Sequence, residues 1–132
     1  MSKIFNISEA ATIGIHSMAL IAKSTTSINA CQIADITGFS KNHISKILQQ
    51  LVKNGVLTST RGPKGGFILK KKAEEINLMD IYRIIEGDIT YDTACRVSCE
   101  DCPFDSCILG GFKEKFSTEF REYLVNKKLS MV

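Results

Sequence analysis

The 132 residues of this chain are enough for one domain with its own core and too few for two independent ones. A hydrophobic share of 44% and a charged share of 23% are typical of a globular protein and argue against a disordered or fibrous chain. No apolar run approaches the roughly 18 residues that a membrane-spanning helix requires, so we expect a cytoplasmic protein without a membrane partner. In that compartment the five cysteines are expected to be free, ligating or redox-active rather than disulfide-bonded.

The net charge of +3 conceals a strongly uneven distribution along the chain. Residues 36–73 contain eight Lys or Arg and no Asp or Glu, so the remainder of the chain carries −5. A basic surface beside an acidic remainder suits a polyanion, because each phosphate contact releases condensed counterions. A solvated lysine-rich face is the alternative interpretation. The eight residues are Lys41, Lys46, Lys53, Arg61, Lys64, Lys70, Lys71 and Lys72.

Helical periodicity dominates the first 54 residues, with expected helices at 8–22, 29–36 and 40–54. Ser8 and Ser40 are suitable N-caps, and Gly38 stands at a C-cap position between the second and third helices. Two extended runs then flank a glycine-rich turn and predict a β-hairpin with strands at 56–60 and 66–70. Further helices are expected at 77–86 and 108–127, whereas 88–107 has no clear period. The fold class is therefore mostly α with a small β-hairpin.

The second and third helices, joined by a short turn with glycine, have the pattern of a helix–turn–helix. In that motif the second helix enters the major groove of DNA. Side chains near its start can read base edges or phosphates, although a plain surface role is open for the histidine. The candidates there are Ser40, Lys41, Asn42, His43 and Lys46. The hairpin tip adds Arg61, Lys64 and Gly65, where glycine would allow a close approach to the backbone or minor groove.

Five stretches of the chain carry a family resemblance. They read CQIAD at 31–35, FSKNHI at 39–44, LVKNGVL at 51–57, RGPKGGF at 61–67 and EINLMDI at 75–81. This pattern resembles the Rrf2 family of bacterial winged-helix transcription regulators, which includes iron–sulfur and nitric-oxide sensing repressors. The resemblance implies a DNA-binding regulator, expected to be a repressor, that binds pseudo-palindromic double-stranded DNA as a homodimer. It divides the chain into a winged helix–turn–helix domain (1–87), a cysteine-rich sensor loop (88–107) and a dimerisation helix with the C-terminus (108–132).

The last predicted helix bears a stripe of large apolar residues spaced by four. These residues are Phe112, Phe116, Phe120 and Leu124. Such a stripe on an otherwise charged helix requires a partner surface, which agrees with a dimer interface. Packing within the chain would account for part of the stripe.

Four cysteines lie within thirteen residues in the order C-x3-C-x2-C-x4-C. Thiolates at this density are expected to ligate an iron–sulfur cluster (2Fe-2S or 4Fe-4S) or zinc. A metal-free thiol or disulfide redox switch is the alternative interpretation of these cysteines. Cluster-bearing relatives resemble C-x5-C-x5-C, and Cys95 and Cys107 match the ends of that motif. Its middle position falls on Asp101, so the resemblance implies Cys95, Cys102 and Cys107 as ligands. Cys99 is a fourth ligand or a spare thiol.

Other ligands are less well supported by the resemblance. Some relatives have a further histidine ligand at the position where this chain has Gly110. Other relatives use a carboxylate or histidine from the partner's first helix as a ligand. Glu9 and His16 align roughly with that position, although a half-buried structural role is the favoured interpretation of His16. Cys31 is expected to be a small core residue.

No catalytic constellation is present, so an enzyme is not expected. A second class of function stays open, a small iron–sulfur or zinc protein whose basic face docks an acidic protein partner. The wing sequence argues against it, because a carrier of electrons or metal does not need one. A third possibility is a family member without cofactor that is regulated by binding another protein.

Overall fold

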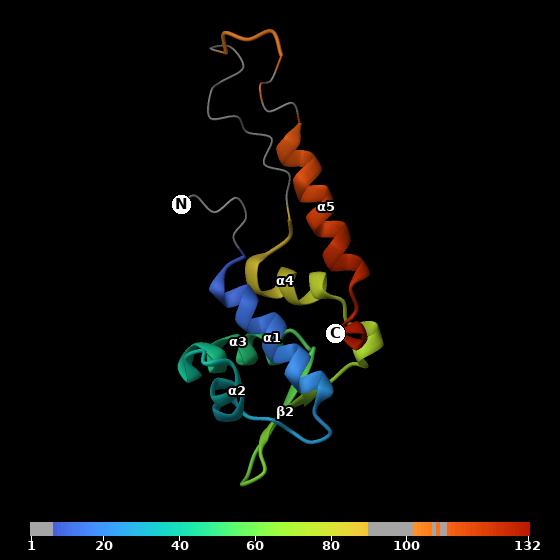
Figure 1. Ribbon diagram of the computed structural model, residues 1–132. Coiled ribbons are helices and arrows are strands. Elements are labelled where there is room, and N and C mark those ends of the chain that lie inside the picture. The colour runs from blue at the N-terminus through green and yellow to red at the C-terminus, as the bar shows by residue number, and fades with distance from the viewer. Residues whose placement is uncertain (1–6, 90–101, 107, 109–110) are drawn as a thin grey trace.

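The computed structural model describes residues 7–89, 102–106, 108 and 111–132. Their order is α1 (Glu9–Lys23), α2 (Ala30–Thr37), α3 (Lys41–Lys53), β1 (Leu57–Thr60), β2 (Gly66–Leu69), η1 (Ala73–Glu75), α4 (Leu78–Glu86), α5 (Phe112–Asn126) and η2 (Leu129–Met131), as Figure 1 shows. This mostly helical architecture with one antiparallel hairpin agrees with the predicted fold class. Among the described residues, no helix is long and apolar enough to cross a membrane.

The helix ends follow local capping rules. The Ser8 side chain accepts a hydrogen bond from the Ala11 amide at 3.1 Å and starts α1, and Ser40 caps α3 in the same way. Gly38 ends α2 in the left-handed conformation with φ 77°, which a residue with a Cβ adopts only at a cost. These three predictions are confirmed. They could be made from sequence because each depends on only a few adjacent residues.

Three helices meet at Gly14, in the middle of α1. A Cβ there would lie 2.1 Å from the Ile85 Cδ1 of α4, and 3.5 Å from methyl groups of Ile47 in α3 and Ile81 in α4. Ile47 and Ile81 belong to the buried apolar cluster, which also contains Leu48 of α3. The absence of a side chain at position 14 thus allows α1, α3 and α4 to pack closely around one core.

Each strand of the wing is one residue shorter than predicted, and a segment from outside the hairpin adds to the sheet. Strands β1 and β2 pair in antiparallel register from Leu57 opposite Leu69 to Thr60 opposite Gly66. Ile28, in the connection between α1 and α2, forms a further antiparallel bridge with Phe67 of β2. The wing is therefore anchored on the segment that leads into the helix–turn–helix.

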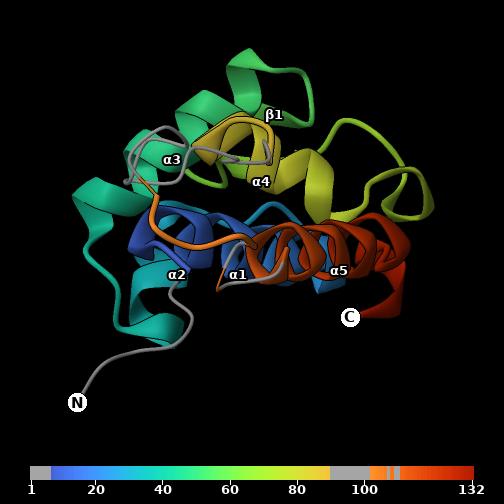
Figure 2. The ribbon, with the colours of Figure 1, turned by 90° about the horizontal axis from the view of Figure 1, so that it is seen from above.

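Helix α5 begins at Phe112, four residues later than predicted. Gly111 occupies the N-cap position with φ 74°, and this left-handed conformation places the helix start after it. The far end of α5 returns to the core, because Leu129 is buried and its amide donates to the Ile76 carbonyl at 2.7 Å. Helix α4 contacts both α3 and α5, as the view from above illustrates (Figure 2).

Candidate nucleic-acid interface

Helix α3 has one buried and one exposed face. The buried face consists of Ile44, Ile47, Leu48 and Leu51. Of the predicted DNA-binding residues on this helix, Ser40, Lys41, Asn42 and Lys46 are exposed and His43 is partly buried. Burial of the apolar face fixes the rotation of α3 about its axis, and so presents the polar residues together to solvent.

The first turn of α3 supplies no negative charge of its own to compensate the helix N-terminus. Its first turn contains no acidic residue, although acidic side chains are stabilising at this end of a helix. Within the described part of the chain, no Lys or Arg of residues 36–73 takes part in an ion pair. The positive charge of this surface is therefore not neutralised by neighbouring described side chains.

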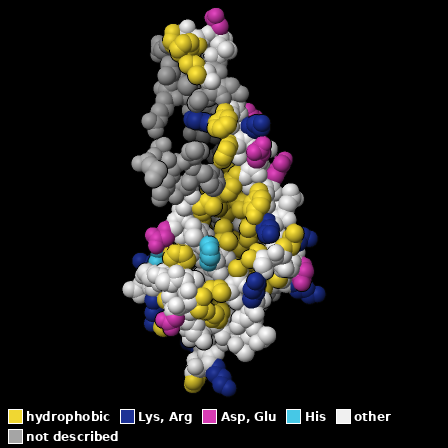
Figure 3. All heavy atoms as spheres, viewed as in Figure 1, with side chains coloured by type: hydrophobic (Ala, Val, Ile, Leu, Met, Phe, Trp, Pro, Cys, Tyr) yellow, Lys and Arg dark blue, Asp and Glu magenta, His cyan; other side chains and the backbone are white. Residues whose placement is uncertain are grey.

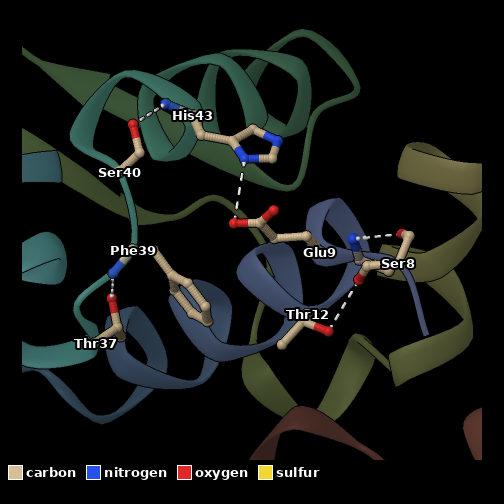
Figure 4. A network of polar contacts seen from close by, with 8 residues as sticks. Ser8, Glu9, Thr12, Thr37, Phe39, Ser40 and His43 are labelled. Atoms are coloured by element: carbon tan, nitrogen blue, oxygen red, sulfur yellow. Dashed lines mark hydrogen bonds and ion pairs between the residues drawn. The ribbon is translucent and has the colours of Figure 1, made fainter. Parts of the chain in front are cut away.

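Glu9 is the acidic residue that approaches this surface. Its Oε1 lies 4.0 Å from the Nδ1 of His43, although 34 positions separate the two in sequence (Figure 4). Ser8 places Glu9 in the first turn of α1 by capping that helix, and its own hydroxyl donates to the Glu86 carboxylate of α4. Close to this contact, the Phe39 ring before α3 meets the His16 ring of α1 edge-on at 6.2 Å. The beginning of α3 is thus held against α1.

The wing tip presents two cations to solvent. Arg61 and Lys64 are both exposed, and Figure 3 shows basic side chains at the lower end of the molecule, where the wing projects in Figure 1. Gly65 has an internal role in this turn, because a Cβ there would lie 2.6 Å from the Thr60 oxygen and 2.8 Å from the Gly62 oxygen. The glycine is therefore required by the turn itself, independently of its predicted contact with DNA.

The cysteine residues are only partly within the described structure. Cys102 is half-buried, and its Sγ lies 4.0 Å from the Phe104 carbonyl oxygen. The other predicted ligands, Cys95, Cys99 and Cys107, lie outside the described residues. Among the residues that are described, no group of three or more Cys, His, Asp or Glu is placed to hold a metal ion.

A comparison with protein families decides the class of this protein. A family model, Rrf2, described as an iron-dependent transcriptional regulator, matches residues 7–132. The chain belongs to the Rrf2 family. It is a DNA-binding transcription regulator and not an enzyme, as predicted. The alternative of an electron or metal carrier is thereby set aside.

Relatives of this Rrf2 protein agree with that assignment. It is 25% identical over 113 residues to an Aquifex aeolicus (strain VF5) protein named as an HTH-type transcriptional regulator, covering 80% of this chain and 78% of the relative. CymR, the global cysteine regulator of B. subtilis, has a similar fold with a TM-score of 0.80, 21% identity, and coverage of 97% of this chain and 95% of CymR. IscR of T. potens gives a TM-score of 0.76, 24% identity, and coverage of 97% and 85%. The winged-helix fold is thereby confirmed.

The apolar stripe of this Rrf2 protein divides into two parts. Phe112 and Phe116 are 58% and 40% exposed, and their rings lie 5.6 Å apart. Phe120 instead packs edge-on against Tyr82 of α4 at 5.5 Å, and Leu124 is only 3% exposed within the single chain. Burial, and to a lesser extent the Glu86 carboxylate, raises the pKa of Tyr82. The exposed part of the stripe is therefore its first half.

Two predictions about single residues in this Rrf2 protein are wrong. Cys31 is exposed rather than in the core, because the neighbouring Ala30 and Ile33 take the buried positions of α2. His16 is exposed rather than half-buried, although its Nδ1 lies 2.8 Å from the Thr12 carbonyl oxygen of the preceding turn.

Proposed function

We propose that the exposed face of α3 and the wing tip together contact operator DNA, and that the protein acts as a repressor. The observation that carries the proposal is the basic window of residues 36–73, which contains no Asp or Glu and whose Lys and Arg have no ion-pair partner among the described residues. A DNA duplex supplies the missing negative charge through its phosphates. The proposed contact residues are Ser40, Lys41, Asn42, His43, Lys46, Arg61, Lys64 and Gly65.

The residues of this surface differ in the chemistry that they offer to DNA. Asn42 has an amide that can bond adenine in a bidentate manner, whereas Lys41 and Lys46 offer point charges suited to phosphates. Arg61, at the exposed wing tip, can enter a groove. We therefore assign sequence reading chiefly to Asn42 and Arg61, and orientation on the backbone to the lysines.

A test of this proposal compares two exposed lysines. Lys46→Ala should weaken binding to all duplexes and reduce the slope of log K against log salt by about 1, because one phosphate contact is lost. Lys113→Ala, on α5 and outside the basic window, is the matched control and should leave the slope unchanged. Fluorescence anisotropy over a salt series measures both. Equal slopes for Lys46→Ala and the parent would remove α3 from the interface.

We further propose a homodimer in which α5 packs against its partner, so that two winged helices bind the two halves of a pseudo-palindromic operator. The exposed rings of Phe112 and Phe116 support this interface, since large apolar side chains on a surface helix mark interaction sites. Phe120 and Leu124 support it indirectly by fixing α5 to the core of its own protomer.

The cysteine segment is proposed to be the sensor. Its donor set of four closely spaced thiols, Cys95, Cys99, Cys102 and Cys107, fits an iron–sulfur cluster (2Fe-2S or 4Fe-4S) and, less well, zinc. The iron-dependent description of the family supports the first choice. When bound, a cluster supplies sensitivity to oxidants or nitric oxide. The acidic residues of this segment favour a bound cation over a free group of thiolates, because a cation compensates the negative charge gathered there.

Protein purified without oxygen tests the sensor. Visible absorbance with iron and sulfide assays should detect a cluster, Cys102→Ser should abolish it, and Cys99→Ser should weaken it less. Operator affinity should differ severalfold or more between the loaded and the metal-free protein, because the usual coupling of about 1–3 kcal/mol corresponds to about 5- to 150-fold. Protein without iron or zinc that binds its operator equally with thiols reduced and oxidised would refute the sensor and leave the DNA-binding function intact.

A further inference from the structure

We propose that Ser27 is a positioning residue for DNA binding, and that its hydroxyl fixes the wing tip relative to the helix–turn–helix. Ser27 lies in the connection between α1 and α2, 37 positions before Lys64. Its Oγ donates a hydrogen bond to the Lys64 carbonyl oxygen at 2.6 Å. This inference rests on the proposed contact of the wing with DNA, and names the residue that holds the wing for it.

The residue after Ser27 already belongs to the wing sheet. The Phe67 amide donates to the Ile28 carbonyl at 2.8 Å, and the Ile28 amide donates to the Phe67 carbonyl at 3.3 Å. Ile28 is also buried in the core. The backbone at Ser27 is therefore held in place by its neighbour, so its hydroxyl reaches Lys64 from a fixed base.

The contact between this connection and the wing leaves no room for a side chain at the base of the hairpin. A Cβ on Gly66 would lie 2.7 Å from the Ile28 carbonyl and 3.0 Å from the Asn29 amide. Asn29 is the N-cap of α2 and forms a capping box with Gln32. One short segment thus contacts the wing and starts the helix–turn–helix, which links the positions of the two DNA-contacting elements.

Beyond this base, few hydrogen bonds hold the tip. The strand pairing ends at Thr60 and Gly66, and within the tip the Gly65 amide donates to the Gly62 carbonyl at 2.8 Å. Of the hydrogen bonds among described residues, the one from Ser27 alone reaches the 61–65 turn from outside the hairpin. The orientation of Arg61 and Lys64 relative to α3 therefore depends on this hydroxyl.

The expected consequence lies in binding rather than in folding. The Ser27 hydrogen bond is exposed to solvent, so water can replace it at little cost to the folded state. A tip without this bond samples more conformations, and DNA must then order it on binding. Loss of preorganisation of this kind lowers affinity without removing any contact to the ligand.

The experiment is a double-mutant cycle on a duplex selected from random sequence by the parent protein, read by fluorescence anisotropy at one salt concentration. Ser27→Ala should weaken binding about three- to tenfold, whereas Ser27→Thr, which keeps the hydroxyl, should stay within about twofold of the parent. Ser59→Ala, an exposed serine of β1, is the matched control and should have no effect. In the Arg61→Ala/Lys64→Ala background, Ser27→Ala should cause no further loss, because the tip side chains that it positions are absent.

Four outcomes overturn the inference. Ser27→Ala that binds like the parent would show that the tip needs no external support. An equal loss in both backgrounds would mean that Ser27 acts through general stability rather than through the wing. A normal affinity of Arg61→Ala/Lys64→Ala would refute the wing contact itself, and the role of Ser27 with it. If the alanine variant folds poorly, the isosteric pair Ser27→Val and Ser27→Thr repeats the test. The inference would also be refuted if both of these variants bound the duplex as tightly as the parent.

Discussion

At the scale of single residues, the contact between Glu9 and His43 makes a testable prediction about the proposed DNA interface. The Glu9 carboxylate is 68% exposed and lies 4.0 Å from His43 on the helix proposed to enter DNA. Its negative charge opposes the approach of phosphates, and repulsion between charges in water reaches about 1 kcal/mol at short range. We therefore expect Glu9 to limit the affinity of the proposed DNA-binding surface.

Neutralising this carboxylate should strengthen DNA binding. We expect Glu9→Gln to raise operator affinity about two- to fivefold at low salt, with a smaller gain at high salt because ions screen exposed charges. Glu119→Gln, at an exposed position on α5, is the control and should change little. Anisotropy titrations at two salt concentrations measure both. Weaker binding by Glu9→Gln would mean that Glu9 supports His43 rather than opposing DNA.

At the scale of elements, α4 connects α3, the proposed recognition helix, with α5. The Gln50 Nε2 of α3 donates to the Ile84 carbonyl at 2.7 Å, near the end of α4 where carbonyls lack helical partners. On another side of α4, Tyr82 packs against Phe120 of α5. The hydrogen bond from Gln50 thus joins the end of α4, from which the cysteine segment follows, to the helix that is proposed to contact DNA.

Removing this cap should loosen the end of α4. Gln50→Met keeps the length of the side chain without the donor and leaves the partly buried Ile84 carbonyl unpaired. We expect a loss of about 1 kcal/mol in the free energy of unfolding in urea. Faster hydrogen exchange in residues 84–87 would locate the change. Gln49→Met, at the exposed neighbouring position, should have little effect, and equal stability of both variants would show that the hydrogen bond contributes nothing.

At the scale of the whole molecule, the division of the apolar stripe determines how the dimer can be tested. Phe120 and Leu124 pack inside the protomer, so changes there would damage the fold as well as any interface. Phe116 is 40% exposed and offers a cleaner position. Phe116→Asp should yield monomers in sedimentation, because a buried charge without a partner is costly at an apolar interface.

The same variant should also lose operator affinity, since both half-sites must be bound together. Phe104→Asp, an exposed phenylalanine outside α5, is the control for adding a charge at an exposed aromatic position. A soluble Phe116→Asp dimer with full operator affinity would exclude this face of α5 from the interface.

Local sequence patterns were sufficient for most of the elements. The caps at Ser8 and Ser40 and the left-handed Gly38 depend on adjacent residues, and the amphipathic period of α3 assigns its buried face directly. The late start of α5 was missed because the conformation of Gly111, rather than the apolar period, begins that helix. The charge of the basic window is likewise a property of the sequence, which is why the DNA-binding function could be predicted before the fold was known.

Contacts between distant segments were decided only by the tertiary structure. Nothing near Ser27 in the sequence indicates the Lys64 carbonyl, and Glu9 and His43 come together because α1 and α3 pack around one core. The four apolar residues of the α5 stripe look alike in sequence, yet α4 covers the second half of the stripe and leaves the first half exposed. The sequence by itself determined most of the helix bounds, the hairpin and the basic window, since these depend on local conformation and composition. The tertiary structure decided which of them meet, because packing depends on the relative positions of elements that no local pattern encodes.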